Sequence, residues 1–245
     1  PDMCSLIVLR GLSLEYPILV AANRDESTSR KSAPPGLFEG MRRRILSPRD
    51  RVAGGTWLAV NDLGHFAGLT NVFGDPLVAD APSRGHLPHL ALDQDDLDSG
   101  VNAVLAHVAE YRHAGFQLVL TDRERIVVIR NAGGDVSCRE WRDPVLSLTN
   151  KHAAGEWTPR ELSSVLQATP SVEDRLDAFA QVLCDRGQGE DHMVCKHGDS
   201  YATVSSSLVA VPQGDIRSLL WRYAPGPPDM TQYRNYSNLA DRLLG

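Results

Sequence analysis

The first part of the chain is built from apolar runs separated by short polar turns. The stretches "CSLIVLRG" at 4–11 and "YPILVAA" at 16–22 are rich in β-branched residues. Each run has the length of a strand and is apolar almost throughout, which predicts a hairpin of two buried strands. Two more hairpins are expected, at 56–71 with a tight turn at 62–64, and at 115–131.

Helical patterns are concentrated in the middle of the chain. Residues 95–114 carry apolar side chains at a helical spacing. Two later helices are predicted from their start signals. One begins at Thr158 with a capping box completed by Glu161, and the other is capped by Ser171 and ends at Gly187.

The remaining segments complete the expected architecture. Short strands are predicted at 136–141 and 145–150 and a late hairpin within 201–228, whereas 23–55 is predicted to be a long functional loop. Strands and helices do not alternate as in parallel folds. We therefore predict one α+β domain over 1–245, a four-layer αββα sandwich of two mainly antiparallel sheets.

Composition narrows the classes of partner. The chain has a formal net charge of -6, which gives no support for binding nucleic acid or an anionic membrane surface. No apolar run approaches the ~20 residues of a membrane span, and no signal-peptide pattern is visible. We expect a cytoplasmic protein with a small-molecule substrate, and the sequence leaves its oligomeric state open.

The cysteines are scattered along the chain. None of them forms a Cys-x-x-Cys pair, which argues against a disulfide framework or a structural zinc site. The segment "HMVCKH" at 192–197 places two histidines around Cys195. As a metal site this pattern is weak, and an inert thiol in a loop or at a strand edge is the favoured interpretation.

Cys4 lies where the first buried strand starts. Its position alone favours a core residue, because cysteine is among the most buried residue types. The predicted hairpin changes this interpretation, since it returns the chain so that Asn23, Arg24 and Asp25 lie beside Cys4. If Met3 is removed, the α-amine of Cys4, with an unperturbed pKa near ~8, could accept the thiol proton. Cys4 and Asp25 are therefore candidate catalytic residues, and Asn23 and Arg24 candidate substrate-binding residues.

Two asparagines and one glycine-rich strand entry add to this site. The tripeptide Leu-Thr-Asn ends two predicted strands, at Asn71 and Asn150. Each asparagine could form a turn or donate to an oxyanion, and both interpretations stay open. In "AGGTWLAVN" at 53–61, Gly55 and Trp57 could form a pocket wall or a bend at the strand entry.

Together, several short segments resemble the NRDE family, whose animal members are the transport-and-Golgi-organisation protein 2 group. The matching motifs occur in order over about residues 4–211. They are Met3-Cys4, Asn23-Arg24-Asp25-Glu26, Gly54-Gly55-Thr56-Trp57-Leu58-Ala59-Val60-Asn61, Leu69-Thr70-Asn71, Ser83-Arg84-Gly85 and Leu148-Thr149-Asn150. The resemblance implies an N-terminal-nucleophile (Ntn) hydrolase fold of αββα type.

More distantly, the chain resembles the cysteine-dependent Ntn amidases that cleave penicillin V and bile-salt conjugates. This resemblance implies that Cys4 is the nucleophile and that Asp25 holds the amine and the thiol. It also implies an oxyanion hole with a main-chain donor near Asn71 and a side-chain donor from Asn150. The implied substrate is an amide or a related acyl group.

Two features depart from the family pattern. Val204 stands in the late strand where the family usually has an arginine, and residues 1–3 block the α-amine of Cys4. One predicted function is that of an Ntn-type cysteine amidohydrolase or acyltransferase that needs no cofactor. A related prediction is an enzyme that uses the same pocket for other chemistry. The alternative is a non-catalytic protein that binds or traffics haem or another hydrophobic ligand. Its candidate iron ligands, each also expected as a surface or loop residue, are His65, His86, His89 and His192.

Overall fold

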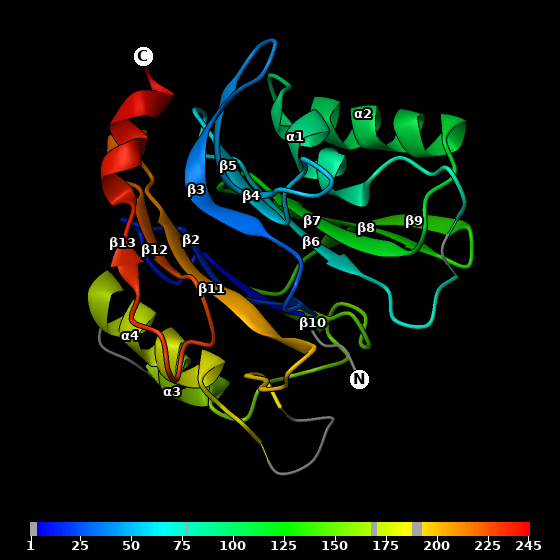
Figure 1. Ribbon diagram of the computed structural model, residues 1–245. Coiled ribbons are helices and arrows are strands. Elements are labelled where there is room, and N and C mark those ends of the chain that lie inside the picture. The colour runs from blue at the N-terminus through cyan, green and yellow to red at the C-terminus, as the bar shows by residue number, and fades with distance from the viewer. Residues whose placement is uncertain (1–3, 77, 168–170, 188–192) are drawn as a thin grey trace. The chain divides into compact units, whose positions relative to one another are not determined.

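The computed structural model describes residues 4–76, 78–167, 171–187 and 193–245 (Figure 1). Contacts within the chain divide it into two compact units, formed by residues 1–30 with 143–238 and by residues 31–142 with 239–245. Each unit contains one antiparallel sheet and its own helices. The α+β class with two mainly antiparallel sheets is thereby confirmed, and the single-domain boundary stays a prediction.

The first unit holds a six-stranded sheet in the order β10-β1-β2-β11-β12-β13. Its strands are β1 (Ser5–Arg10), β2 (Ile18–Ser27), β10 (Val145–Thr149), β11 (Tyr201–Val211), β12 (Leu220–Ala224) and β13 (Arg234–Asn235). β1 and β2 form the predicted N-terminal hairpin, in which Leu6 is paired with Ala22. The two ends of the described chain thus contribute strands to one sheet, because β11 pairs with β2.

Helices α3 (Leu162–Gln167) and α4 (Val172–Leu183) cover one face of this sheet (Figure 1). Alternate residues of β1, such as Ile7 and Leu9, belong to the same core cluster as Phe179 of α4. The intervening residues of β1 are buried as well, as its uninterrupted apolar sequence predicts. The helices therefore pack on this face because the apolar stripe of each helix buries the apolar side chains of the sheet.

The second unit holds a seven-stranded sheet in the order β3-β4-β5-β6-β7-β8-β9. Its strands are β3 (Ser32–Glu39), β4 (Arg44–Asp50), β5 (Leu58–Asn61), β6 (Phe66–Asn71), β7 (Phe116–Thr121), β8 (Ile126–Ala132) and β9 (Asp135–Trp141). Helices α1 (Leu87–Leu92) and α2 (Leu97–Glu110) pack on one face of it. Short 3-10 turns occur at Arg84–His86, Ile216–Ser218 and Ser237–Leu243.

The predicted long loop at 23–55 is wrong. β2 continues through Asn23 to Ser27, and β3 and β4 form a hairpin in the rest of this segment. The prolines at 34 and 35 disguised the strand, but β3 is an edge strand and its register shifts between Ala33 and Gly36. An edge position and a bulge are the places where a sheet tolerates proline.

The two predicted helix starts have different outcomes. Ser171 is the N-cap residue of α4, as predicted, although its side chain makes no capping hydrogen bond and the helix ends at Leu183 rather than at Gly187. The capping box at Thr158 is wrong, because α3 begins only at Leu162. The N–H of Leu162 donates to the carbonyl of Pro159 at 3.2 Å, so a tighter turn replaces the first predicted helical turn.

Candidate active site

Cys4 lies immediately before β1, at the end of the six-stranded sheet where β2 carries its polar residues. The β1–β2 register pairs Ser5 with Asn23, so Cys4 is beside Arg24 and Asp25. The Sγ of Cys4 donates a hydrogen bond to the main-chain oxygen of Asp25 at 3.3 Å. The structure therefore brings together the thiol and the polar cluster, as the hairpin pattern predicts.

The carboxylate of Asp25 is held by residues from later parts of the chain. Thr203 Oγ1 donates to Asp25 Oδ1 at 2.7 Å, and Lys196 Nζ lies 4.0 Å from Asp25 Oδ2. The hydroxyl of Tyr201 donates to the main-chain oxygen of Asp25 at 2.7 Å. Because the Asp25 side chain is fully buried, these contacts keep a charged group in an otherwise enclosed position.

The local surroundings disfavour the thiolate form of Cys4. Burial of the sulfur and then the negative charge of Asp25 raise the pKa of Cys4 to about 12, and the nearby Arg24 lowers it in part. Part of the Cys4 residue stays accessible even though protein atoms surround its sulfur. At neutral pH the thiol therefore keeps its proton, and it needs a base to act as a nucleophile.

Asn150 follows β10 and lies beside Cys4 on the side opposite to β2. Its N–H donates to the main-chain oxygen of Cys4 at 3.3 Å. Among the described residues, no donor reaches the buried Oδ1 of Asn150. Because a half-turn of a side-chain amide exchanges its oxygen and nitrogen, the same position can present N–H donors to a bound group.

Asn23 and Arg24 have structural contacts of their own. Asn23 Nδ2 donates to the carbonyls of Leu183 and Val194 at 2.9 and 3.0 Å, so its amide ties β2 to the end of α4. Arg24 pairs with Glu26 at 3.4 Å. Arg24 is close enough to Cys4 to affect the pKa of its thiol, and the role of both residues in substrate binding stays a prediction.

The other predicted site residues lie in the second unit. Asn71 ends β6 and is exposed. Gly55 is buried against Gly85 so closely that a Cβ atom on Gly55 would lie 2.4 Å from the Gly85 carbonyl carbon. The expected close backbone approach is thus present, and Trp57, which is partly buried, directly precedes β5. These three residues belong to the second unit, and their predicted roles stay predictions.

Sequence reasoning missed Lys196 and Thr203 as neighbours of Asp25. Lys196 lies within "HMVCKH", a segment that we interpreted through its sulfur and imidazole groups. Thr203 pairs with Asp25 across β2 and β11, and the register shifts between Thr203 and Ser205, so Val204 is the extra residue of a bulge. Knowledge that β11 pairs with β2 would have revealed this contact, because that pairing places the polar residue Thr203 opposite Asp25.

The sequence model of the Transport and Golgi organisation 2 family matches residues 3–220. The chain belongs to this family. The Transport and Golgi organization protein 2 homologs of Homo sapiens and Bos taurus are each 35% identical to it, over 126 and 140 residues. These matches cover 50% and 54% of the chain, and 43% and 47% of the two relatives. The chain thus spans about half the length of the curated relatives it matches.

Among solved structures, a variant of conjugated bile acid hydrolase from Clostridium perfringens is similar to the chain, with a TM-score of 0.53 and 10% sequence identity. The match covers 95% of this chain and 96% of that one. At this identity the likeness shows the fold alone. It confirms the predicted Ntn-hydrolase-like fold class for this member of the Transport and Golgi organisation 2 family.

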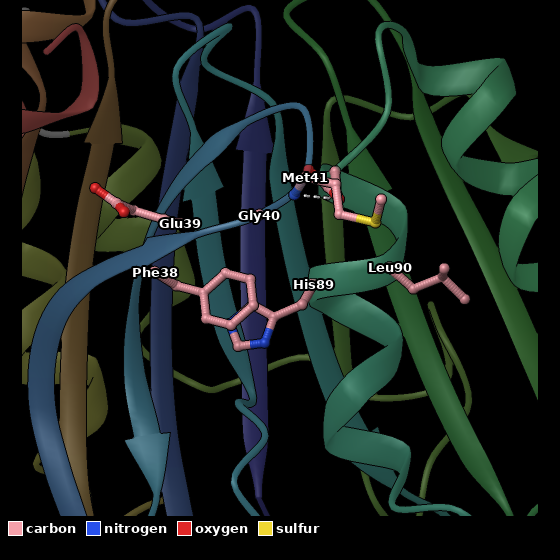
Figure 2. Close-up of a pocket in the computed structure, with 7 residues that line it drawn as sticks. Phe38, Glu39, Gly40, Met41, His89 and Leu90 are labelled. Carbon is pink, nitrogen blue, oxygen red and sulfur yellow. Dashed lines mark hydrogen bonds between the residues drawn. The ribbon is translucent and has the colours of Figure 1, made fainter.

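A second candidate site in this family member is an open pocket of about 300 Å³ in its second unit (Figure 2). It is lined by Phe38, Glu39, Gly40, Met41, His89, Leu90 and Asp93. The Asp93 carboxylate accepts the N–H groups of Met41, Arg42 and Arg43 at 2.8–2.9 Å, which closes the β3–β4 turn. Figure 2 shows Glu39 directed away from the stacked rings of Phe38 and His89. The stacked rings therefore form an apolar wall of the pocket, and the Asp93 carboxylate is used to hold the β3–β4 turn.

The histidines named for the haem alternative have varied surroundings. His89 is stacked on Phe38, and burial lowers its pKa to about 4. His86 Nε2 lies 3.1 Å from the carbonyl of Ala53, and burial lowers the pKa of His65. His192 lies outside the described residues. Haem binding therefore stays a prediction, and no contact described here favours it.

None of the helices in the described ranges is long and apolar enough to cross a membrane.

Proposed function

We propose that the chain is an Ntn-type cysteine amidohydrolase or acyltransferase that acts through a thioester on Cys4. One observation carries the proposal: at the end of the six-stranded sheet the Cys4 thiol donates to the main-chain oxygen of Asp25, and the N–H of Asn150 donates to the main-chain oxygen of Cys4, so residues that bear a thiol, a carboxylate and a side-chain amide are neighbours. These are a nucleophile, an anionic positioning group and an oxyanion donor, the components that acyl transfer needs. The Ntn-hydrolase-like fold is consistent with this use of the first strand.

The reaction begins with transfer of the thiol proton to the α-amine of Cys4 in a chain that starts at this residue. The sulfur then attacks the substrate carbonyl carbon, a C–S bond forms and the carbonyl oxygen becomes an oxyanion. Asn150 can donate to that oxygen. As the C–N bond breaks, the ammonium returns its proton to the leaving amine, and the thioester remains. Water hydrolyses the thioester, or an acceptor amine takes the acyl group.

Asp25 is proposed to position the ammonium group that forms in the first step. Its buried carboxylate already carries a hydrogen bond from Thr203 and lies 4.0 Å from Lys196 Nζ. Lys196 thus supplies a cation beside Asp25 in a chain whose late strand has Val204 where the family usually has arginine. We propose that Lys196 compensates for that arginine by placing a positive charge beside the Asp25 carboxylate.

Intact-protein mass spectrometry tests this function. A chain that begins at Cys4 is mixed with activated amides and esters, and a covalent acyl adduct of one equivalent is expected. The Cys4→Ala variant should form no adduct, whereas Cys138→Ala, which removes an exposed thiol on β9, should react as the unchanged chain does. Decay of the adduct in water and in the presence of an acceptor amine distinguishes hydrolysis from acyl transfer.

Two results would contradict the proposal. The first is the absence of an adduct with every activated acyl donor in a folded chain that begins at Cys4. The second is an adduct that persists in Cys4→Ala. Circular dichroism shows whether each variant is folded, so that loss of the adduct is not mistaken for loss of the fold.

A further inference from the structure

A second group of reactive side chains lies in the first unit and takes no part in the proposed acyl transfer. Cys195 and His197 come from the segment before β11, and Asp229 comes from the turn after β12. The Cys195 residue is fully buried, the Asp229 side chain is 12% exposed and the His197 side chain is 33% exposed. The cluster therefore has a closed inner side and one side open to solvent.

The three donor atoms form a compact triangle. Cys195 Sγ lies 3.8 Å from His197 Nε2 and 3.2 Å from Asp229 Oδ1, and His197 Nε2 lies 3.1 Å from the same oxygen. A tetrahedral zinc ion, with bonds of ~2.3 Å to sulfur and ~2.0–2.2 Å to nitrogen and oxygen, places its ligand atoms roughly 3.3–3.6 Å apart. The observed triangle differs from that geometry by only a few tenths of an ångström.

This arrangement does not match a nucleophile relay. In a catalytic triad the histidine uses one ring nitrogen toward the nucleophile and the other toward the carboxylate. Here Nε2 of His197 faces both the sulfur of Cys195 and the carboxylate of Asp229. Three groups that converge on one point through one atom each are the pattern of a metal site.

The surroundings hold the triangle in place. Arg186 contacts Asp229 Oδ2 through Nε and Nη2, both at 2.5 Å, which leaves Oδ1 directed to the sulfur and the imidazole. The N–H of Cys195 donates to the carbonyl of Asp185 at 2.8 Å. In known metal sites, such contacts around the ligands fix the orientation of the ligating side chains.

We propose that Cys195, His197 and Asp229 bind a divalent transition-metal ion of the zinc class, with the fourth position open to a water molecule. Thiolate, imidazole and carboxylate together suit zinc better than magnesium or calcium, which prefer oxygen ligands alone. On binding, the Cys195 thiol loses its proton to solvent and the sulfur bonds to the metal.

The bound ion would also join two segments that are distant in the chain. Lys196 lies between the two ligands Cys195 and His197 in the sequence, and its Nζ lies 4.0 Å from Asp25 Oδ2. A metal that fixes Cys195 and His197 to Asp229 would therefore fix Lys196 beside Asp25. The metal site itself does not depend on the proposed acyl transfer, and it can be tested without it.

Cobalt spectroscopy tests the site directly. The full chain is stripped of metal with a chelator and titrated with Co²⁺, and then with Zn²⁺ as competitor. One equivalent of Co²⁺ should produce a thiolate-to-cobalt charge-transfer band with visible bands of four-coordinate intensity, and Zn²⁺ should remove both. Cys195→Ser should lose the charge-transfer band, and His197→Gln and Asp229→Asn should each weaken Co²⁺ binding by more than ~10-fold.

Matched variants keep the test open to failure. Cys184→Ala, which removes the neighbouring thiol, and Cys138→Ala, which removes a thiol of the other unit, should both keep the band. His197 is partly exposed, so its substitution tests binding in a chain that stays folded, with circular dichroism as the check. A band that survives in Cys195→Ser, a band lost in Cys184→Ala instead, or no binding by the unchanged chain would each overturn the proposal.

Discussion

Cys4 and Cys195 are two thiols of the same unit that each lie close to an aspartate. Burial is the largest cause that raises the pKa of each to about 12, and the charge of the nearby aspartate adds to it. Cys4 donates to the main-chain oxygen of Asp25, whereas Cys195 donates to the carboxylate of Asp229 and faces an imidazole. The two thiols thus share a raised pKa but have different neighbouring groups.

The difference shows that a raised pKa alone does not define a thiol's chemistry. Cys4 adjoins an amide that can donate to an oxyanion, and its own α-amine would be the base. Cys195 adjoins two further ligand atoms at metal-binding separations. Because a thiol with so high a pKa is protonated at neutral pH, each needs a partner that removes its proton. We propose an amine for the first thiol and a metal ion for the second.

The largest expected effect comes from freeing the α-amine of Cys4. The chain that begins at Cys4 should acylate about 10²–10⁴ times faster than the chain with residues 1–3 attached, because it gains a general base. Stopped reactions analysed by intact mass give both rates. Equal rates would show that Cys4 uses no amine, and the contrast with Cys195 would then have to be redrawn.

The next effect concerns the oxyanion donor. Asn150→Ala, in the chain that begins at Cys4, should lower the rate of acylation by roughly 10²–10³-fold, as loss of one oxyanion-hole donor does. Asn71→Ala provides a comparison from the other predicted donor position. Unchanged acylation in Asn150→Ala, with normal folding, would remove Asn150 from the site.

The effect of Zn²⁺ on the free energy of unfolding should distinguish the two thiols. At a Zn²⁺ concentration about 100 times its dissociation constant, binding to the folded state adds about 2.7 kcal/mol to the free energy of unfolding. Cys4→Ala should keep this gain, and His197→Gln should lose it. Chemical denaturation with and without Zn²⁺ measures the effect, and loss of the gain in Cys4→Ala would show that the two thiols are not independent.

The smallest expected effect is on alkylation of the thiols in the chain with residues 1–3 attached. The negative charge of Asp25 raises the pKa of Cys4, so Asp25→Asn should lower that pKa and increase alkylation by iodoacetamide at neutral pH by roughly 10-fold, for a change of about one pKa unit. Acylation of the chain that begins at Cys4 should fall in the same variant, because the ammonium loses its positioning group.

Asp229→Asn is the matched substitution at the second thiol. It should lower the pKa of Cys195, since the hydrogen bond and charge of Asp229 raise it. Alkylation of Cys195 should nevertheless stay slow, because that residue is fully buried. Peptide mapping after alkylation distinguishes the two cysteines, and fast modification of Cys195 in this variant would show that access does not limit it.

Much of the first site could be predicted because a hairpin is local. The apolar runs at 4–11 and 16–22 are strand-like and joined by a short turn, so their pairing places Cys4 beside Asp25 without further information. The prediction for residues 23–55 was wrong for the opposite reason, because it depended on contacts that are not local. Its prolines suggested a loop, and only the edge position of β3 and the register shift after Ala33 show how a strand accommodates them.

By itself, the sequence determined the main strands, the antiparallel class and the approach of Cys4 to Asp25, because these follow from residue patterns over short distances. The tertiary structure decided that Lys196 and Thr203 surround Asp25 and that Asp229 joins Cys195 and His197 across 34 residues. No local pattern encodes such contacts. They arise when β11 pairs with β2 and the turn after β12 folds back, so packing rather than spacing brings these side chains together.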